Sequence, residues 1–352
     1  MKYKTIIFFA IGIVIMAIML WFIGIEQVFD ALKLANPLYI FIAILIQFVI
    51  YILFTIRWQF ITNLTNKNFS FKQLLPMVLV SLAFNNITPS GRGGGEPIRA
   101  YLLTNETGEP FSDTFATVIT DRALDTIPFV LLAIITIIGL IGHVSLSPII
   151  LFIMIIAVIA IVVLVFIVIY MSINEKFGVK ITNLITSLAI RIFKKRDPER
   201  LKNRIEKSVS GFQSTMRVLT TNKRVLYFGI PISFLIWVLE ISRVYIVILA
   251  FGCNVTPILI GEIFIVSSLV GMIPLLPGGL GAVDGFMILL YKSAGISTPI
   301  SAASTVVERL ISFWMTTIIG LIILPKYGNH ILEQLYSILS SEPEETNETS
   351  EL

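Results

Sequence analysis

Six mainly apolar stretches, each about as long as a membrane-spanning helix, dominate this chain of 352 residues. A helix needs about 20 mainly apolar residues to cross the hydrocarbon core of a bilayer. The chain is 56% hydrophobic and 14% charged, with a mean hydropathy of +0.91, whereas soluble domains carry about 25% charged residues. The sequence therefore predicts an all-α polytopic membrane protein with spanning helices at 5–25, 38–62, 115–141, 148–170, 224–251 and 299–325.

Two further apolar regions, 74–104 and 256–293, are each interrupted by a glycine-rich motif. The motif reads PSGRGGGE in the first region and PGGLGAVD in the second. The apolar arms are shorter than a spanning helix, and backbone that is broken inside a bilayer must face protein or a water-filled cavity. The two regions therefore predict re-entrant hairpins, with backbone-shaping glycines at Gly91, Gly93, Gly94, Gly95, Gly278, Gly279 and Gly281.

The two motifs belong to a longer internal repeat. Seven residues separate the proline from the acid in both copies (96 − 89 and 284 − 277). Thirteen residues separate a later glycine from an acid–arginine pair in both copies (121 − 108 and 308 − 295). This matched spacing predicts two repeat units, 74–141 and 256–325. Broken segments in corresponding halves of a membrane protein are the best sequence-level indication of a transport site.

Basic residues in the loops predict the orientation of these segments. Residues 175–224 hold 13 Lys or Arg against 4 Asp or Glu, and such an excess marks the cytoplasmic side. Basic residues at the amino terminus and in the 57–73 loop, Arg57 among them, place both on that side. We therefore expect a cell-membrane protein with six crossings and both termini in the cytoplasm. In this topology the hairpins enter from opposite faces, as an inverted repeat.

The domain organisation that we expect is simple. Residues 1–330 form one integral membrane domain, and the acidic tail at 331–352 is disordered. Apolar residues at helical spacing predict an amphipathic helical region with a basic polar side at 171–223. Such a helix would lie in the headgroup layer and attract anionic lipid. A solvated charged loop explains the same composition equally well.

Charged residues inside apolar segments are the candidate functional residues, because each costs about 2.5–3.5 kcal/mol at the bilayer centre unless it is paired or hydrated. Glu308 and Arg309 are adjacent, so their side chains point apart and each needs a partner on another element. We expect hairpin acids to supply some of these partners. The candidate substrate-binding residues are Arg92, Glu96, Arg99, Asp121, Arg122, Asp125, Glu240, Arg243, Asp284, Glu308 and Arg309.

Arginine and glycine together point to a phosphate-bearing ligand. Arginine binds phosphate through two parallel hydrogen bonds, glycine lets the backbone approach a ligand closely, and consecutive amides can bind an anion. We therefore expect membrane lipids, mainly anionic ones, as partners, and no nucleic acid. His143 and His330 lie far apart, so we expect no metal and no other cofactor. Buried ion pairs that only fasten hairpins to helices are the alternative interpretation.

A family resemblance adds a function to this chemistry. The runs from Asn86 to Arg99 and from Leu276 to Asp284, with the pairs at 121–122 and 308–309, resemble the flippase-like membrane domain of lysylphosphatidylglycerol synthetases. The resemblance covers about residues 5–325. It implies a domain that moves a polar lipid between leaflets, whereas the synthetase activity belongs to a separate soluble domain. Only about 25 residues follow the last predicted helix, so the resemblance does not imply that activity here.

Three functional hypotheses follow from the sequence. The first is a lipid flippase that moves a phospholipid, an aminoacyl-lipid or a polyprenyl-linked lipid by alternating access. The second is an ion or small-solute carrier with the same inverted architecture. The third is a membrane-embedded enzyme acting on a lipid phosphate, with a buried carboxylate as acid or base. The enzyme hypothesis is the weakest, because no nucleophile lies beside a histidine and no metal cluster is evident.

Overall fold

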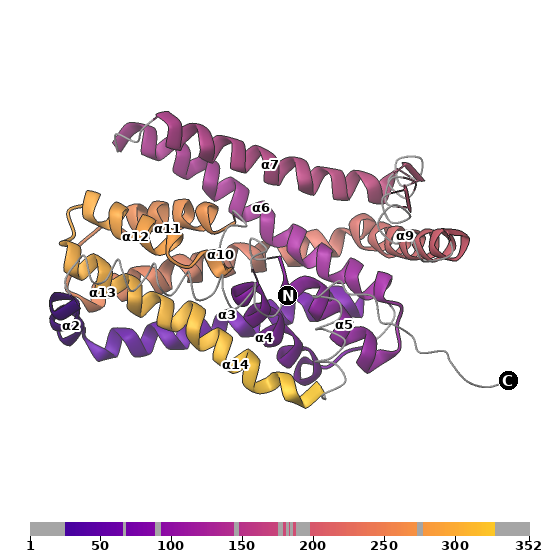
Figure 1. Cartoon of the computed structure of the whole chain (residues 1–352), viewed down its shortest axis with the longest axis horizontal. Coiled ribbons are helices and arrows are strands. Elements are labelled where there is room, and N and C mark those ends of the chain that lie inside the picture. The colour runs from indigo at the N-terminus through magenta and orange to yellow at the C-terminus, as the bar shows by residue number, and fades with distance from the viewer. Residues whose placement is uncertain are drawn as a thin grey trace.

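The computed structural model describes residues 25–65, 68–88, 93–143, 148–174, 198–272 and 277–327, with a few positions between 179 and 187 (Figure 1). All regular elements among these residues are helical. In chain order they are α2 (Ile25–Lys33), α3 (Pro37–Asn63), α4 (Phe71–Ile87), α5 (Gly95–Thr107), α6 (Phe111–His143), α7 (Pro148–Ile173), α9 (Pro198–Thr221), α10 (Lys223–Ala250), α11 (Pro257–Gly271), η1 (Pro277–Gly279), α12 (Ala282–Ser293), α13 (Thr298–Arg309), η2 (Leu310–Met315), α14 (Thr316–Ile323) and η3 (Leu324–Tyr327).

Four helical stretches are long and apolar enough to cross a membrane: Pro37–Asn63, Phe111–Gly139, Lys223–Ala250 and Thr298–Tyr327. They confirm four of the six predicted spans. The helix α7, with 26 residues, coincides with a fifth. The first predicted span, 5–25, lies almost wholly outside the described residues.

Both interrupted regions form pairs of short helices. The first broken segment consists of α4 and α5, which pack against each other. A Cβ atom on Gly95 would lie 1.9 Å from the backbone oxygen of Ser81, so only glycine permits this approach. The second broken segment consists of α11, η1 and α12. Its break uses left-handed backbone at Gly278, Gly279 and Gly281, with φ of 54°, 69° and 79°, which glycine adopts without steric cost.

The two halves of the chain pack as interlocked units. The long helix of the first half, α3, packs along its counterpart α10. The helix α4 contacts α14, and α11 contacts α6, so each broken segment rests on a spanning helix of the other half. In Figure 1, α11 and α12 lie towards the left end of the view and α5 lies right of centre. The second break lies against the end of α4, since a Cβ atom on Gly278 would lie 2.9 Å from the backbone oxygen of Asn86.

The helix α9 carries the basic amphipathic sequence. Its buried residues Met216 and Leu219 lie on the side that packs against α6, and the ring of Phe212 lies 6.1 Å from that of Phe115. At least part of the apolar face of this helix therefore covers protein. The preceding part of the predicted amphipathic region, before residue 198, lies largely outside the described residues.

We predict that Gly278→Ala destabilises the protein more than Gly108→Ala does. Both glycines have positive φ, but a Cβ at Gly278 would meet the ring of Phe313 at 2.2 Å, whereas nothing lies within 4 Å of one at Gly108. Overpacking at Gly278 should add about 1–3 kcal/mol to the shared backbone cost. The melting temperature of purified protein in detergent measures the difference, and equal melting temperatures would contradict tight packing around the second break.

Candidate functional site

The centre of the protein is built around two reciprocal arginine contacts between α3 and α10. Arg57 of α3 donates to the hydroxyl of Ser233 on α10 at 2.7 Å, and Arg243 of α10 donates to the amide oxygen of Gln47 on α3. The same offset of 186 residues relates both pairs (243 − 57 and 233 − 47). Each half therefore contacts the other through the same two positions, as two subunits do across a two-fold axis.

Each of these arginines also binds the acid of the repeated acid–arginine pair. Arg57 contacts Asp121 at 2.7 Å, and Arg243 contacts Glu308 at 2.9 Å. Arg57 reaches Asp125 as well, at 2.9 Å. Apart from Asp125, whose side chain is 10% exposed, these side chains are at most 4% exposed. Removing one partner from such a pair would leave an uncompensated buried charge.

The acids of the broken segments bind the arginines of the same repeated pairs. Arg309 contacts Asp284 at 2.5 Å, and Arg122 contacts Glu96 at 3.5 Å. This confirms the expectation that acids of the glycine-rich motifs would partner the charged residues of the spanning helices. The two contacts differ in exposure, because the side chain of Arg122 is 34% exposed and that of Arg309 is 6% exposed.

Pairing also occurs within single helices. Arg243 contacts Glu240 at 2.6 Å, and Arg122 contacts Asp125 at 3.7 Å. Both pairs are three residues apart, which places the two side chains on one helix face. The charges of each half are therefore joined both along a helix and between helices.

The assignment of Arg57 to a cytoplasmic loop is wrong. The residue lies inside α3, its side chain is 1% exposed, and it binds two carboxylates and a hydroxyl. The orientation argument treated Arg57 as one of several basic loop residues, because it lies near the end of an apolar run. Its spacing carries a signal that was available in the sequence: Arg57 precedes Asp121 by 64 residues, and Arg243 precedes Glu308 by 65.

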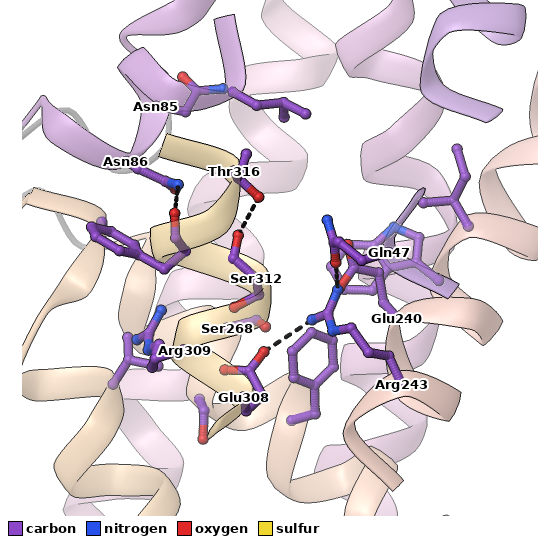
Figure 2. A pocket seen from close by; sticks show the side chains of 18 of the residues that line it. Gln47, Asn85, Asn86, Glu240, Arg243, Ser268, Glu308, Arg309, Ser312 and Thr316 are labelled. Carbon is purple, nitrogen blue, oxygen red and sulfur yellow. Dashed lines mark hydrogen bonds and ion pairs between the residues drawn. The ribbon is translucent and has the colours of Figure 1, made fainter. Parts of the chain in front are cut away.

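A cavity of about 140 Å³, lined by both polar and apolar side chains, lies between the two halves (Figure 2). Figure 2 shows Arg243 bonded to Gln47 and Glu308 beside this space. The volume exceeds what water needs, and the lining offers many polar partners. The lining residues with polar side chains are Gln47, Asn85, Asn86, Arg122, Asp125, Trp237, Glu240, Arg243, Ser267, Ser268, Glu308, Arg309, Ser312 and Thr316.

Not all predicted site residues line the cavity. Six of them do: Arg122, Asp125, Glu240, Arg243, Glu308 and Arg309. Four form a layer behind it: Glu96, Arg99, Asp121 and Asp284. Arg92 and Gly91 lie outside the described residues. The six lining residues carry three positive and three negative charges.

Arg99 and two of the motif glycines are engaged with protein groups. Arg99 binds Asp121 at 3.0 Å, and its guanidinium lies 4.6 Å from the ring centre of Trp58. The Gly95 amide donates to Asn85 at 2.7 Å, and the Gly281 amide donates to Asp284 at 2.7 Å. Those two amides hold the broken segments in shape.

The uncharged polar lining was missed by sequence reasoning. Gln47, Ser267 and Ser268 lie in apolar helices and belong to no motif. Gln47 was detectable only through the repeat, because it occupies the position that Ser233 holds in α10 (233 − 47 = 186). Ser267 and Ser268 are identified as lining residues by the packing of α11 beside the second break.

Comparisons with known proteins agree with the resemblance. The family model described as the lysylphosphatidylglycerol synthase TM region matches residues 9–320. A UPF0104 membrane protein of Methanothermobacter thermautotrophicus is 48% identical over 95% of this chain and 99% of its own length. A second one from that organism is 30% identical over 93% of this chain and 95% of its own. A relative from Pyrococcus horikoshii is 28% identical over 92% and 97%.

We predict that Arg57→Met is strongly destabilising, because it leaves Asp121 and Asp125 without their shared partner. Breaking a buried ion pair in this way costs about 3–5 kcal/mol. Adding Asp125→Asn, which removes one of the two acids but keeps Asp121 as the partner of Arg99, should restore part of the loss. Melting temperatures in detergent test this, with Arg224→Met at an exposed site as the control. If Arg57→Met melts like the control, Arg57 does not anchor the interface.

Proposed function

Because this chain belongs to the family of the lysylphosphatidylglycerol synthase transmembrane region, we propose that it moves a phosphate-bearing polar lipid between the leaflets of the cell membrane. Phospholipids, aminoacyl-lipids and polyprenyl-linked lipids all belong to this class. The relatives are described only as membrane proteins. The proposal therefore rests on the site of this chain and its family, and it includes no catalytic step.

The observation that carries the proposal is a charged cavity inside an apolar helical protein. Six ionisable side chains line a space of about 140 Å³, and intramembrane charges of this kind mark substrate or ion pathways. This space is too small for acyl or isoprenoid chains, so only a polar headgroup would enter it. In this mechanism the headgroup crosses through the protein while the chains stay in the surrounding lipid.

We also propose that the two halves form an inverted repeat whose broken segments re-enter the membrane from opposite faces. The shared offset of 186 residues between the contacts of α3 and α10 supports this (243 − 57 and 233 − 47). So does the exchange of partners, in which each broken segment packs on a spanning helix of the other half. Inverted repeats around a central site are the architecture of alternating-access carriers.

The unequal arginine contacts suggest how access would alternate. Arg309 and Asp284 form a short, buried pair, whereas Arg122 is partly exposed and contacts Glu96 at 3.5 Å. In the proposed cycle the Arg309–Asp284 pair is closed in this state and the Arg122–Glu96 contact is loosened. The opposite state would tighten the Arg122–Glu96 contact and loosen the Arg309–Asp284 pair, because the two halves have equivalent designs.

The small volume of the cavity favours a second candidate function, an ion or small-solute carrier. A cavity of about 140 Å³ accommodates a hydrated ion without expansion. Transport of solute in vesicles, without any movement of lipid, would support that candidate instead.

We predict that liposomes containing the purified protein move a headgroup-labelled phospholipid between leaflets. Arg122→Ala and Arg309→Ala should each slow this movement by about 10- to 100-fold, since a hydrogen bond to a charged group contributes about 1.5–3 kcal/mol. Quenching of the label in the outer leaflet measures the rate. Arg224→Ala, at an exposed site away from the cavity, is the matched control.

Melting temperatures must accompany this assay, because Arg309 is buried and its loss affects folding as well. Arg122 is partly exposed, so Arg122→Ala is the cleaner variant. Normal lipid movement by both folded variants would contradict the proposed site. A wild-type protein that moves no labelled lipid would contradict the proposed function.

A further inference from the structure

The lining of the cavity contains hydrogen-bond donors that the described protein does not use. Ser267 and Ser268 are each 1% exposed and Arg309 is 5% exposed. Among the described residues, neither serine hydroxyl has a hydrogen-bond partner, and neither does Nη2 of Arg309. All three residues line the cavity. Buried polar groups are nearly always bonded, so three groups without a protein partner around one space are candidates to bind a ligand there.

The two serines differ from other helical serines in this chain. Ser233, Ser242 and Ser293 each donate to the carbonyl four residues earlier, at 2.8, 2.7 and 3.0 Å. That local bond is the usual solution for a serine in an apolar helix. Ser267 and Ser268 make no such bond, although they lie within α11. Their hydroxyls are therefore available to a group in the cavity.

The donor set determines what kind of group fits. A guanidinium nitrogen donates hydrogen bonds and accepts none, so the group against Nη2 of Arg309 must be an acceptor and not a metal cation. The serine hydroxyls can donate to the same group. Arg243 contributes only Nε, because Nη1 binds Gln47 and Glu240 and Nη2 binds Glu308. Most of the available donors therefore lie on α11 and α13.

The surrounding charges limit how negative the acceptor can be. Arg243 and Arg309 are joined in this half by three carboxylates, those of Glu240, Asp284 and Glu308. With one more carboxylate than guanidinium, the site disfavours added negative charge, and it disfavours a doubly charged group more than a singly charged one. A phosphomonoester carries about −1.5 to −2 at neutral pH, whereas a phosphodiester has one ionisable oxygen and carries a single charge.

On this basis, and resting on the lipid carrier proposed above, we infer that Ser267, Ser268 and Arg309 form a subsite for a singly charged phosphodiester group. The subsite belongs to the second half of the protein alone. In the first half, the buried arginines Arg57 and Arg99 both bind Asp121 and do not line the cavity. The phosphate of a lipid headgroup enters this subsite while the rest of the headgroup occupies the remaining cavity.

The test is ligand binding to the purified full-length chain in detergent, measured by calorimetry. Three probes separate the possible sources: dihexanoylphosphatidylglycerol, a phosphodiester lipid; dihexanoylphosphatidic acid, a phosphomonoester lipid; and inorganic phosphate. The phosphodiester lipid should bind most tightly. The double variant Ser267→Ala/Ser268→Ala should weaken its binding by about tenfold or more.

The matched control is the double variant Ser301→Ala/Ser304→Ala. These serines are also buried in the second half, but they bond to backbone carbonyls and do not line the cavity. The control should bind the phosphodiester lipid like the wild type. The double variant at 267 and 268 should melt no lower than the wild type, because it removes hydroxyls that have no protein partner.

Either of two binding results would overturn the inference. One is unchanged binding by the variant at 267 and 268; the other is equal or tighter binding of the phosphomonoester lipid or inorganic phosphate. The lipid-movement assay distinguishes failure of the subsite from failure of the proposed function. Labelled lipid that still moves at the wild-type rate in the variant would refute the subsite and leave the carrier standing. Binding without any movement by the wild type would refute the carrier.

Discussion

The structure depends on the two arginines that cross between α3 and α10. Arg57 and Arg243 are each 1% exposed, and each joins its own helix to the opposite long helix and to an acid of its own half. Burying a guanidinium is costly unless carboxylates or other acceptors pair with it. The two halves must therefore dock in one register, with the cavity between them. The position of the broken segments follows from that docking.

The same constraint explains why the centre of the protein carries many charged side chains without being a general anion-binding site. Most of these side chains are paired with one another, so a ligand must use hydrogen-bond donors that have no protein partner. Alternating access requires two arrangements of packed elements that differ by a small free energy. The unequal contacts of Arg122 and Arg309 provide such a difference within one structure. In our proposal the substrate shifts the balance between the two arrangements by binding beside the Arg309–Asp284 pair.

Much of this organisation was predictable from the sequence. Length and hydropathy located four confirmed spanning helices, and motif spacing located both broken segments and the arginines of the repeated pairs. Arg57 was misplaced because its charge was read as a loop signal, although the repeat offset identifies it. Ser267 and Ser268 were not predictable, because a serine in an apolar helix normally bonds to its own backbone. Only the packing of α11 beside the second break gives them another role.

The central claim is that the two halves are inverted around the shared cavity, and impermeant maleimide labelling of intact cells tests it most directly. In a Cys253→Ser background, Asn105→Cys reports the exposed end of α5 and Ser293→Cys the exposed end of α12. We predict labelling of the Ser293→Cys variant in intact cells, and of the Asn105→Cys variant only after permeabilisation. Labelling of both variants from the same side of the membrane would contradict the inverted arrangement.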